Sequence, residues 1–273
     1  EGYMKAGLLD RAETVFTDLA RIDERAPQAL KHLLGIYQAE RDWERAIDNA
    51  LRYEEVTGEP MGKLVAQFEC ELAERHRANG DLDAARAAIA RAYQADAGCV
   101  RAGILEGRIE AGDGNPDAAI RAYERAARHD PDYLPEFLPS LLACYGEVGD
   151  TAGARAFLAE MSEHYRGIAP VLALTGLIEA QEGAQAARDY LGRPLKDRPS
   201  VRGEAALIDL TLAVGADSTA TLHDLKHITD QLLVRNPSYR CNRCGFGARS
   251  HHWQCPSCKE WGTVKPLLNY AVV

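Results

Sequence analysis

Several features that mark other classes of protein are scarce or missing in this 273-residue chain. Aromatic residues make up 7% of it and runs of β-branched residues are rare, which disfavours an all-β fold. No stretch of about 18 apolar residues is present and no signal peptide is visible, so we expect nothing here to span a membrane. Phosphate-binding loops, dinucleotide-binding glycine motifs, H-E-x-x-H and nucleophile elbows are also absent, and we predict no catalytic residues.

The residues that are abundant favour helix. Alanine, leucine, arginine and glutamate dominate a composition that is 46% hydrophobic and 27% charged. The net charge of −9 is unevenly distributed, because residues 1–234 carry −14 and residues 235–265 carry +5. This asymmetry predicts two modules with different surfaces. An acidic body of this kind is a poor match for nucleic acid, whose phosphates need a basic surface.

A short unit recurs along the chain. It consists of a turn with Gly or Asp, an apolar residue, two or three polar residues, an alanine, and an apolar residue four positions later. The marker alanines of successive copies are Ala12, Ala46, Ala85, Ala119 and Ala154. Their spacings are 34, 39, 34 and 35 residues. A period of about 34 residues is typical of the tetratricopeptide repeat, which is a pair of antiparallel helices.

Small residues stand where the two helices of such a pair must touch. In one copy they are Ala73, Ala85 and Ala92, and in the next they are Gly107, Ala119 and Ala126. A generic alanine-rich bundle is the alternative, but its turns need not recur at near-equal intervals. The first marker alanine comes only twelve residues into the chain, so we expect the chain to start inside a repeat.

The repeat pattern weakens after about residue 199. Residues 201–214 and 222–235 still have helical patterns, and the second shows an apolar stripe at Leu222, Leu225, Ile228 and Leu232. Asn236 and Pro237 should end it. We predict three parts: tetratricopeptide repeats at 1–198, capping helices and a linker at 199–237, and a metal-binding module at 238–273. The predicted fold class is therefore all-α, a tetratricopeptide α-solenoid with a small C-terminal knuckle.

Seven cysteines divide into two groups. Cys70, Cys99 and Cys144 are isolated in helical contexts and are expected to be buried. The other four form two C-x-x-C pairs with the spacing C-x2-C-x10-C-x2-C: Cys241, Cys244, Cys255 and Cys258. Paired C-x-x-C turns are typical of a four-thiolate site for zinc or iron in a reducing compartment. Redox disulfides are the weaker alternative.

A module of about thirty residues cannot bury enough apolar surface to fold alone, so we predict that one structural metal ion stabilises it. Phe246, Trp253 and Trp261 are expected to form its small core. His251 and His252 could compete as ligands, although four thiolates already complete the shell and a surface position is the simpler expectation. Zinc is preferred to iron because the sequence shows no second redox centre.

A binding surface for partner proteins can also be predicted. In tetratricopeptide stacks the first helix of each pair lines a concave groove. Alignment on the marker alanines places there Gln28, Lys31, Gln38, Gln67, Glu74, Arg77, Arg101 and Arg108. This mixed polar set suits a peptide or protein. A plainly solvated helix face is the competing interpretation.

The knuckle has a specific sequence. It contains YRCNRCGF from Tyr239, WQCPSC from Trp253 and WGTVKP from Trp261. Repeats followed by this segment resemble the lipopolysaccharide assembly protein B family, also called the YciM family, whose C-terminal knuckle is rubredoxin-like. Its four cysteine ligands correspond to the four paired cysteines of this chain, and the helical part is similar throughout.

The resemblance implies a non-enzymatic adaptor at the cytoplasmic face of the inner membrane. The family helps the membrane protease FtsH degrade the deacetylase that commits precursors to lipid A, and an inner-membrane sensor protein is thought to restrain it. The family's N-terminal membrane helix and first repeats have no counterpart in these 273 residues. We therefore expect this part of the protein to be soluble, without direct membrane contact, and the sequence does not predict an oligomeric state.

Two other functions compete with this one. The local charge of +5 would suit a nucleic-acid-binding zinc ribbon on a repeat stalk. An iron-loaded knuckle would suit an electron carrier, which would be coloured.

Overall fold

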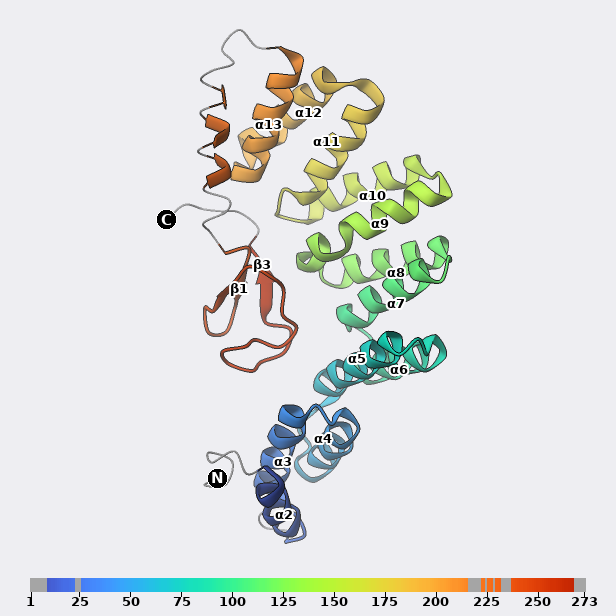
Figure 1. Cartoon of the computed structure of the whole chain (residues 1–273), viewed down its shortest axis with the longest axis vertical. Helices are drawn as coiled ribbons and strands as arrows, with labels where there is room; N and C mark the ends of the chain where they lie inside the picture. The colour runs from blue at the N-terminus through green and yellow to red at the C-terminus, as the bar shows by residue number, and fades with distance from the viewer. Residues whose placement is uncertain are drawn as a thin grey trace. The chain divides into compact units, whose positions relative to one another are not determined.

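The computed structural model describes residues 9–22, 26–215, 222–223, 225–227, 229–231 and 237–267. The chain divides into two compact units, Glu1–His129 and Asp130–Val273. Both units are built from helices joined by short turns, and the second also holds a small sheet (Figure 1). The helical-repeat fold class with a C-terminal knuckle is confirmed.

The described part of the first unit is entirely helical. Its helices are α2 (Leu9–Leu19), α3 (Ala26–Glu40), α4 (Trp43–Thr57), α5 (Gly62–Ala78), α6 (Leu82–Ala95), α7 (Val100–Gly112) and α8 (Pro116–His129). Consecutive helices pack as pairs, α3 with α4, α5 with α6 and α7 with α8. The marker alanines Ala46, Ala85 and Ala119 lie on the second helices of these pairs, Ala12 lies on α2, and all four are buried.

Side-chain caps explain why the second helix starts where it does. Asp42, Asp81 and Asp150 each accept a hydrogen bond from the backbone N–H three residues later, which satisfies a donor that the first turn leaves open. The turn before the cap needs a positive φ. Gly80 adopts φ +80° there, and Arg41 takes φ +58° in the copy that lacks the glycine. The repeated motif is thus a helix-start signal.

Small residues bring the paired helices together, as predicted. The Gly107 Cα on α7 faces the ring of Tyr123 on α8 so closely that an added Cβ would lie 2.5 Å from it. Ala119 and Ala126 on the same face of α8 are buried. Tyr123 is completely buried, and burial of an aromatic ring stabilises such a contact.

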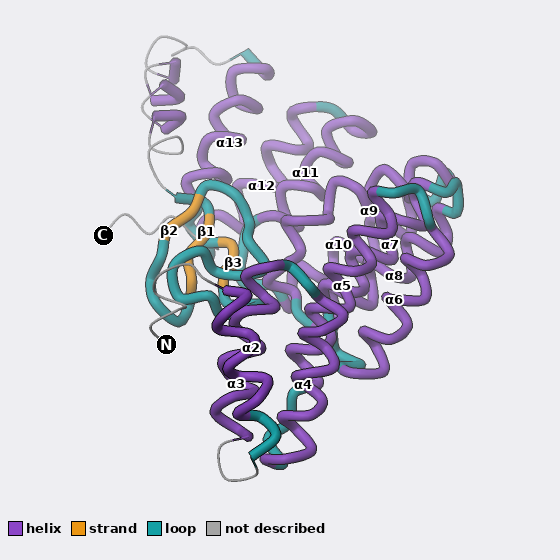
Figure 2. The backbone as a smooth tube through the Cα atoms, turned by 60° about the horizontal axis from the view of Figure 1, so that its bottom comes forward, coloured by secondary structure: helices purple, strands orange, loops and turns teal. Residues whose placement is uncertain are grey.

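The second unit continues the helix pairs and adds the knuckle. It contains the 3₁₀ turn η2 (Pro131–Tyr133), then α9 (Leu134–Val148), α10 (Thr151–His164), α11 (Ala169–Glu182), α12 (Ala184–Asp197) and α13 (Val201–Val214). The strands β1 (Tyr239–Cys241), β2 (Gly247–Ala248) and β3 (Val264–Pro266) follow. They form an antiparallel sheet in the order β2-β1-β3, visible in Figure 2.

The predicted helix at 201–214 is confirmed as α13. The second predicted helix is helical at 222–223, 225–227 and 229–231, whereas Ile228, Leu232 and its end at Asn236 lie outside the described residues. Cys70, Cys99 and Cys144 are buried as expected. The predicted three-part division, with boundaries after residues 198 and 237, stays a prediction.

Candidate metal centre

Two matching turns position the four cysteines. In the first, Gly245 N–H donates to the Cys241 carbonyl at 2.9 Å, and in the second, Lys259 N–H donates to the Cys255 carbonyl at 2.9 Å. The residue after the second cysteine of each turn has a positive φ, +78° at Gly245 and +61° at Lys259. Each turn therefore aims two sulfurs at one point, and the sheet brings the two turns together.

The sulfur positions fit a tetrahedral metal shell. All four Sγ atoms lie within 4.8 Å of one another. The Cys241–Cys258 and Cys244–Cys255 sulfur pairs are each 3.8 Å apart. A tetrahedron with Zn–S bonds of about 2.3 Å has edges of about 3.8 Å, so the ligand set is already spaced for the ion. Cys241, Cys244, Cys255 and Cys258 would hold it, and the bound metal would supply the bonds that a core this small lacks.

The electrostatics of the four thiols show why a cation is needed. A hydrogen bond between Thr263 Oγ1 and Cys241 Sγ at 3.3 Å lowers the pKa of Cys241 to about 6. The N–H of Phe246 lowers the pKa of Cys244. At Cys258 the Glu260 N–H acts in the same direction, but burial and the neighbouring thiols outweigh it and raise the pKa to about 12. Successive thiolates repel one another, and a divalent cation removes that repulsion.

The core of the knuckle differs from the prediction. Val264 and the ligands Cys241 and Cys255 form its buried centre, with Tyr239 and Phe246 packed against it. Phe246 was expected there and does pack against this centre, whereas Trp253 and Trp261 are not part of it; all three side chains are half-buried. A three-stranded sheet this short has one inward position on β3, and Val264 fills it.

Trp253 and His251 instead face the helices of the same unit. The Trp253 ring centroid lies 5.0 Å from that of Tyr133, and the His251 ring stands edge-on to Tyr133 at 5.5 Å and to Trp253 at 4.6 Å. His251 is therefore a packing residue of an aromatic cluster, and the expected surface position is wrong for it. His252 is also half-buried.

Polar contacts join the knuckle to η2 and α9. Tyr133 Oη donates to the Gly262 carbonyl at 2.9 Å, and Tyr239 Oη donates to Glu136 Oε1 at 2.5 Å. Lys265 forms an ion pair with Asp130 and lies 3.7 Å from the centre of the Tyr133 ring. We call this set of contacts the knuckle seat. The sequence carries no local signal for it, because its partners are more than a hundred residues apart.

The predicted groove residues lie on the first helices of the pairs in the first unit. The exposed ones are Gln28, Lys31, Arg77 and Arg108, and the half-buried ones are Gln38, Gln67 and Glu74. Arg101 departs from the expectation, since its side chain is only 2% exposed. Its guanidinium lies 2.9 Å from Glu71 and 3.4 Å from Glu74, so it neutralises carboxylates between α5 and α7 and offers no open surface.

A family of known metal-binding modules matches the knuckle. The sequence model of the rubredoxin metal binding domain, in its LapB zinc-ribbon form, matches residues 239–266. The fold and the site together define a helical-repeat protein with a rubredoxin-like four-cysteine metal domain.

Curated relatives match along nearly the whole chain. Lipopolysaccharide assembly protein B of Escherichia coli strain K12 is 36% identical over 267 residues, which cover 97% of this chain and 69% of that protein. The protein of the same name from Haemophilus influenzae is 29% identical over 272 residues, covering 98% and 68%. The chain belongs to the lipopolysaccharide assembly protein B family.

Among solved structures, pilF of Pseudomonas aeruginosa is similar with a TM-score of 0.42 and 16% identity, covering 78% of this chain and 92% of that one. Within the described part of the chain, no helix has the length and apolar character needed to cross a membrane.

Proposed function

We propose that this protein is a non-enzymatic adaptor that regulates lipopolysaccharide biosynthesis. In this proposal it presents the deacetylase that commits precursors to lipid A to the membrane protease FtsH, at the cytoplasmic face of the inner membrane, and an inner-membrane sensor protein restrains it. The observation that carries the proposal is the match to lipopolysaccharide assembly protein B over 97% of the chain. Helix pairs of this kind present an extended surface, which suits a scaffold that holds other proteins.

The metal has a structural role in this proposal, and zinc is the ion. Four thiolates fill all positions of a tetrahedral shell, so no open position is left for a substrate or a metal-bound water. Metal analysis of the purified protein tests the choice, because an iron-loaded knuckle would be coloured and would favour the electron-carrier alternative.

The partner surface is proposed to be the groove of the first unit. Arg77 near the end of α5 and Arg108 on α7 are exposed. The Arg101 ion pairs with Glu71 and Glu74 tie together α5 and α7, the two helices that carry these cations. The exposed cations therefore stand on a fixed surface, which lowers the cost of ordering them when a partner binds.

The nucleic-acid alternative is weakened by how the basic side chains of the knuckle are used. Arg243 pairs with Glu260, and Lys265 pairs with Asp130. Four thiolates around a divalent metal also add two negative charges to the module. Both effects lower the net positive charge that the knuckle could offer to phosphates.

Direct binding of the purified deacetylase to this chain tests the proposal. We expect calorimetry to detect a complex, and the addition of the chain to accelerate degradation of the deacetylase by purified FtsH. Charge reversal at both groove cations, Arg77→Glu with Arg108→Glu, should weaken binding at least about tenfold, because exposed interface charges steer and orient partners.

The matched control is Arg121→Glu, an exposed residue on the second helix of a pair. Equal weakening by Arg121→Glu would show that net charge matters and the groove does not. Unchanged degradation of the deacetylase in the presence of the chain would contradict the adaptor role.

A further inference from the structure

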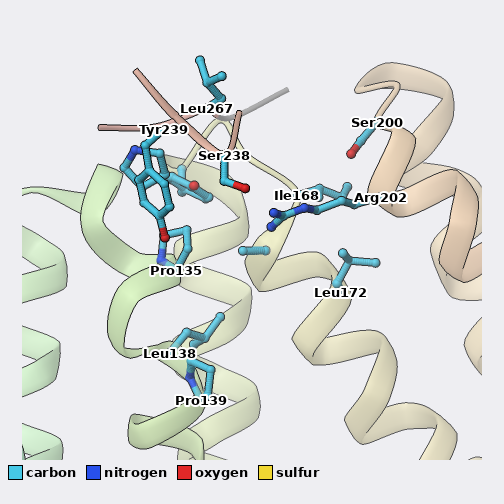
Figure 3. A pocket seen from close by; sticks show the side chains of 13 residues that line it. Pro135, Leu138, Pro139, Ile168, Leu172, Ser200, Arg202, Ser238, Tyr239 and Leu267 are labelled. Atoms are coloured by element: carbon cyan, nitrogen blue, oxygen red, sulfur yellow. The ribbon is translucent and has the colours of Figure 1, made fainter. Parts of the chain in front are cut away.

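A pocket of about 250 Å³ lies in the second unit, between the knuckle and the helices (Figure 3). Part of its helical side is apolar, with Leu138 and Pro139 from the second turn of α9, Leu172 from the first turn of α11, and Ile168 just before α11. The opposite side belongs to the knuckle segment that follows residue 237. The pocket is distinct from the metal site, since none of the four cysteines lines it.

The polar groups of the pocket favour an anion. Among the described residues that line the pocket, Arg202, in the first turn of α13, is the one cation, and none of those residues is a carboxylate. Figure 3 shows its guanidinium extending into the hollow towards the hydroxyl of Ser238, while Ser200 lies farther away, near the start of the helix that carries Arg202. The first turn of α11 has no side-chain cap at Ile168, so the positive end of that helix adds to the same potential.

The size of the pocket limits what fits. At about 250 Å³ it is smaller than the roughly 300–1,000 Å³ of sites for drug-sized ligands, and it holds only one or two amino-acid residues. A free C-terminus carries its carboxylate and its last side chain on the same carbon atom. Both groups then fit a hollow that has one guanidinium and apolar walls within a few ångströms. An internal acidic residue is followed by further chain on both sides, and a pocket of this size has no room for both continuing segments.

We propose that this pocket captures the C-terminal end of a partner polypeptide whose last residues are apolar. The carboxylate pairs with Arg202 and accepts hydrogen bonds from Ser238 and Ser200, and the terminal side chain lies against Leu172 and Pro139. Capture of a terminal carboxylate is a known mode of peptide recognition. This inference does not depend on whether the deacetylase is a partner, because the pocket would recognise the C-terminal end of any polypeptide with suitable last residues.

The metal controls this pocket indirectly. Tyr239, Pro266 and Leu267 form its knuckle side. Tyr239 pairs with Pro266 across β1 and β3, and Leu267 N–H donates to the Ser238 carbonyl at 2.8 Å. One wall therefore exists only while the sheet of the knuckle is folded, and the sheet depends on the metal. We expect a metal-stripped chain to lose binding of the terminus.

A degenerate peptide pool provides the test. The zinc-loaded full chain is immobilised and offered acetyl-Gly-Ser-Gly followed by four randomised residues, with either free carboxylate or amide ends. We expect retention of carboxylate peptides, enrichment of Leu, Ile and Val at the last two positions, and little retention of the amide pool. The best peptide should bind Arg202→Gln about tenfold or more weakly than the unaltered chain, since a charge-assisted pair is lost.

Three further chains complete the design. Arg193→Gln removes an exposed arginine of α12 that does not line the pocket and should bind normally. Leu172→Glu, with helicity checked by circular dichroism, places a carboxylate in the hollow and should abolish binding. A truncation after Leu267 should bind as the full chain does. The proposal would be overturned by equal retention of both pools or by normal binding to Arg202→Gln. Binding by the truncated chain alone would also overturn it, because the chain's own C-terminal end would then fill the pocket.

Discussion

At the scale of single residues, the turns of the knuckle depend on two left-handed positions. Gly245 and Lys259 both follow the second cysteine of a C-x-x-C turn, at φ +78° and +61°. Glycine adopts this conformation freely, whereas a residue with a Cβ pays about 1–2 kcal/mol for it. The first turn is therefore relaxed and the second carries strain that the metal holds in place.

This asymmetry predicts opposite effects of exchanging the two residue types. Gly245→Ala should weaken zinc binding about fivefold or more, because its φ becomes unfavourable although no atom lies within 4 Å of the added Cβ. Lys259→Gly should bind zinc as well as or slightly better than the parent. Competition with a zinc chelator measures both. Lys259→Ala is the control, because it removes the charge and keeps the strain, and tighter binding by that variant would assign the effect to charge.

At the scale of elements, close contact between paired helices depends on where side chains are missing. Gly107 of α7 lies against the ring of Tyr123, and an added Cβ would approach it to 2.5 Å. Gly35 of α3 is also inside a helix, but nothing lies within 4 Å of its added Cβ. The two glycines share a conformation and differ only in their neighbours.

Alanine substitution should therefore have opposite signs at the two sites. Gly107→Ala should lower the free energy of unfolding by about 1–3 kcal/mol, because the ring cannot move without opening the helix pair. Gly35→Ala should raise it by up to about 1 kcal/mol through helix propensity alone. Urea titration followed by far-ultraviolet circular dichroism compares them. A stabilised Gly107→Ala chain would show that α7 and α8 separate at little cost.

At the scale of the whole molecule, the knuckle belongs to the second compact unit and rests on its helices through the knuckle seat. The helices have their own buried apolar cores, so they do not need the metal to stay helical. The seat nevertheless covers η2 and the start of α9 and should slow amide hydrogen exchange there, because Tyr133 is buried beside Gly262.

Loss of the metal should accordingly have a local effect. In Cys258→Ser or a chelator-treated chain, we expect helical circular dichroism to be retained while amide hydrogen exchange accelerates in residues 130–137 and 238–267. Exchange in α5 and α6 of the first unit should not change. Cys70→Ser, which removes a buried thiol of α5 that is no metal ligand, serves as the control and should leave exchange in residues 130–137 and 238–267 unchanged. A large loss of helical signal in Cys258→Ser would contradict this prediction.

The sequence by itself determined the features that depend on neighbours along the chain. The aspartate caps such as Asp81 and the turns at Gly80 act within four residues, and similar turns recur with the marker alanines at intervals of 34 to 39 residues, so this pattern predicted the repeats. The two C-x-x-C pairs likewise determined the ligand set, because each turn positions its own two sulfurs.

Only the tertiary structure decided which side chains became buried and what the knuckle rests on. Arg101 had the pattern of a groove residue, but packing of α7 on α5 enclosed it between Glu71 and Glu74. Trp253 looked like a core residue and instead packs on Tyr133. The pocket around Arg202 joins segments that are distant in sequence. These outcomes depend on how separate elements pack together, and that packing has no local period that a sequence could display.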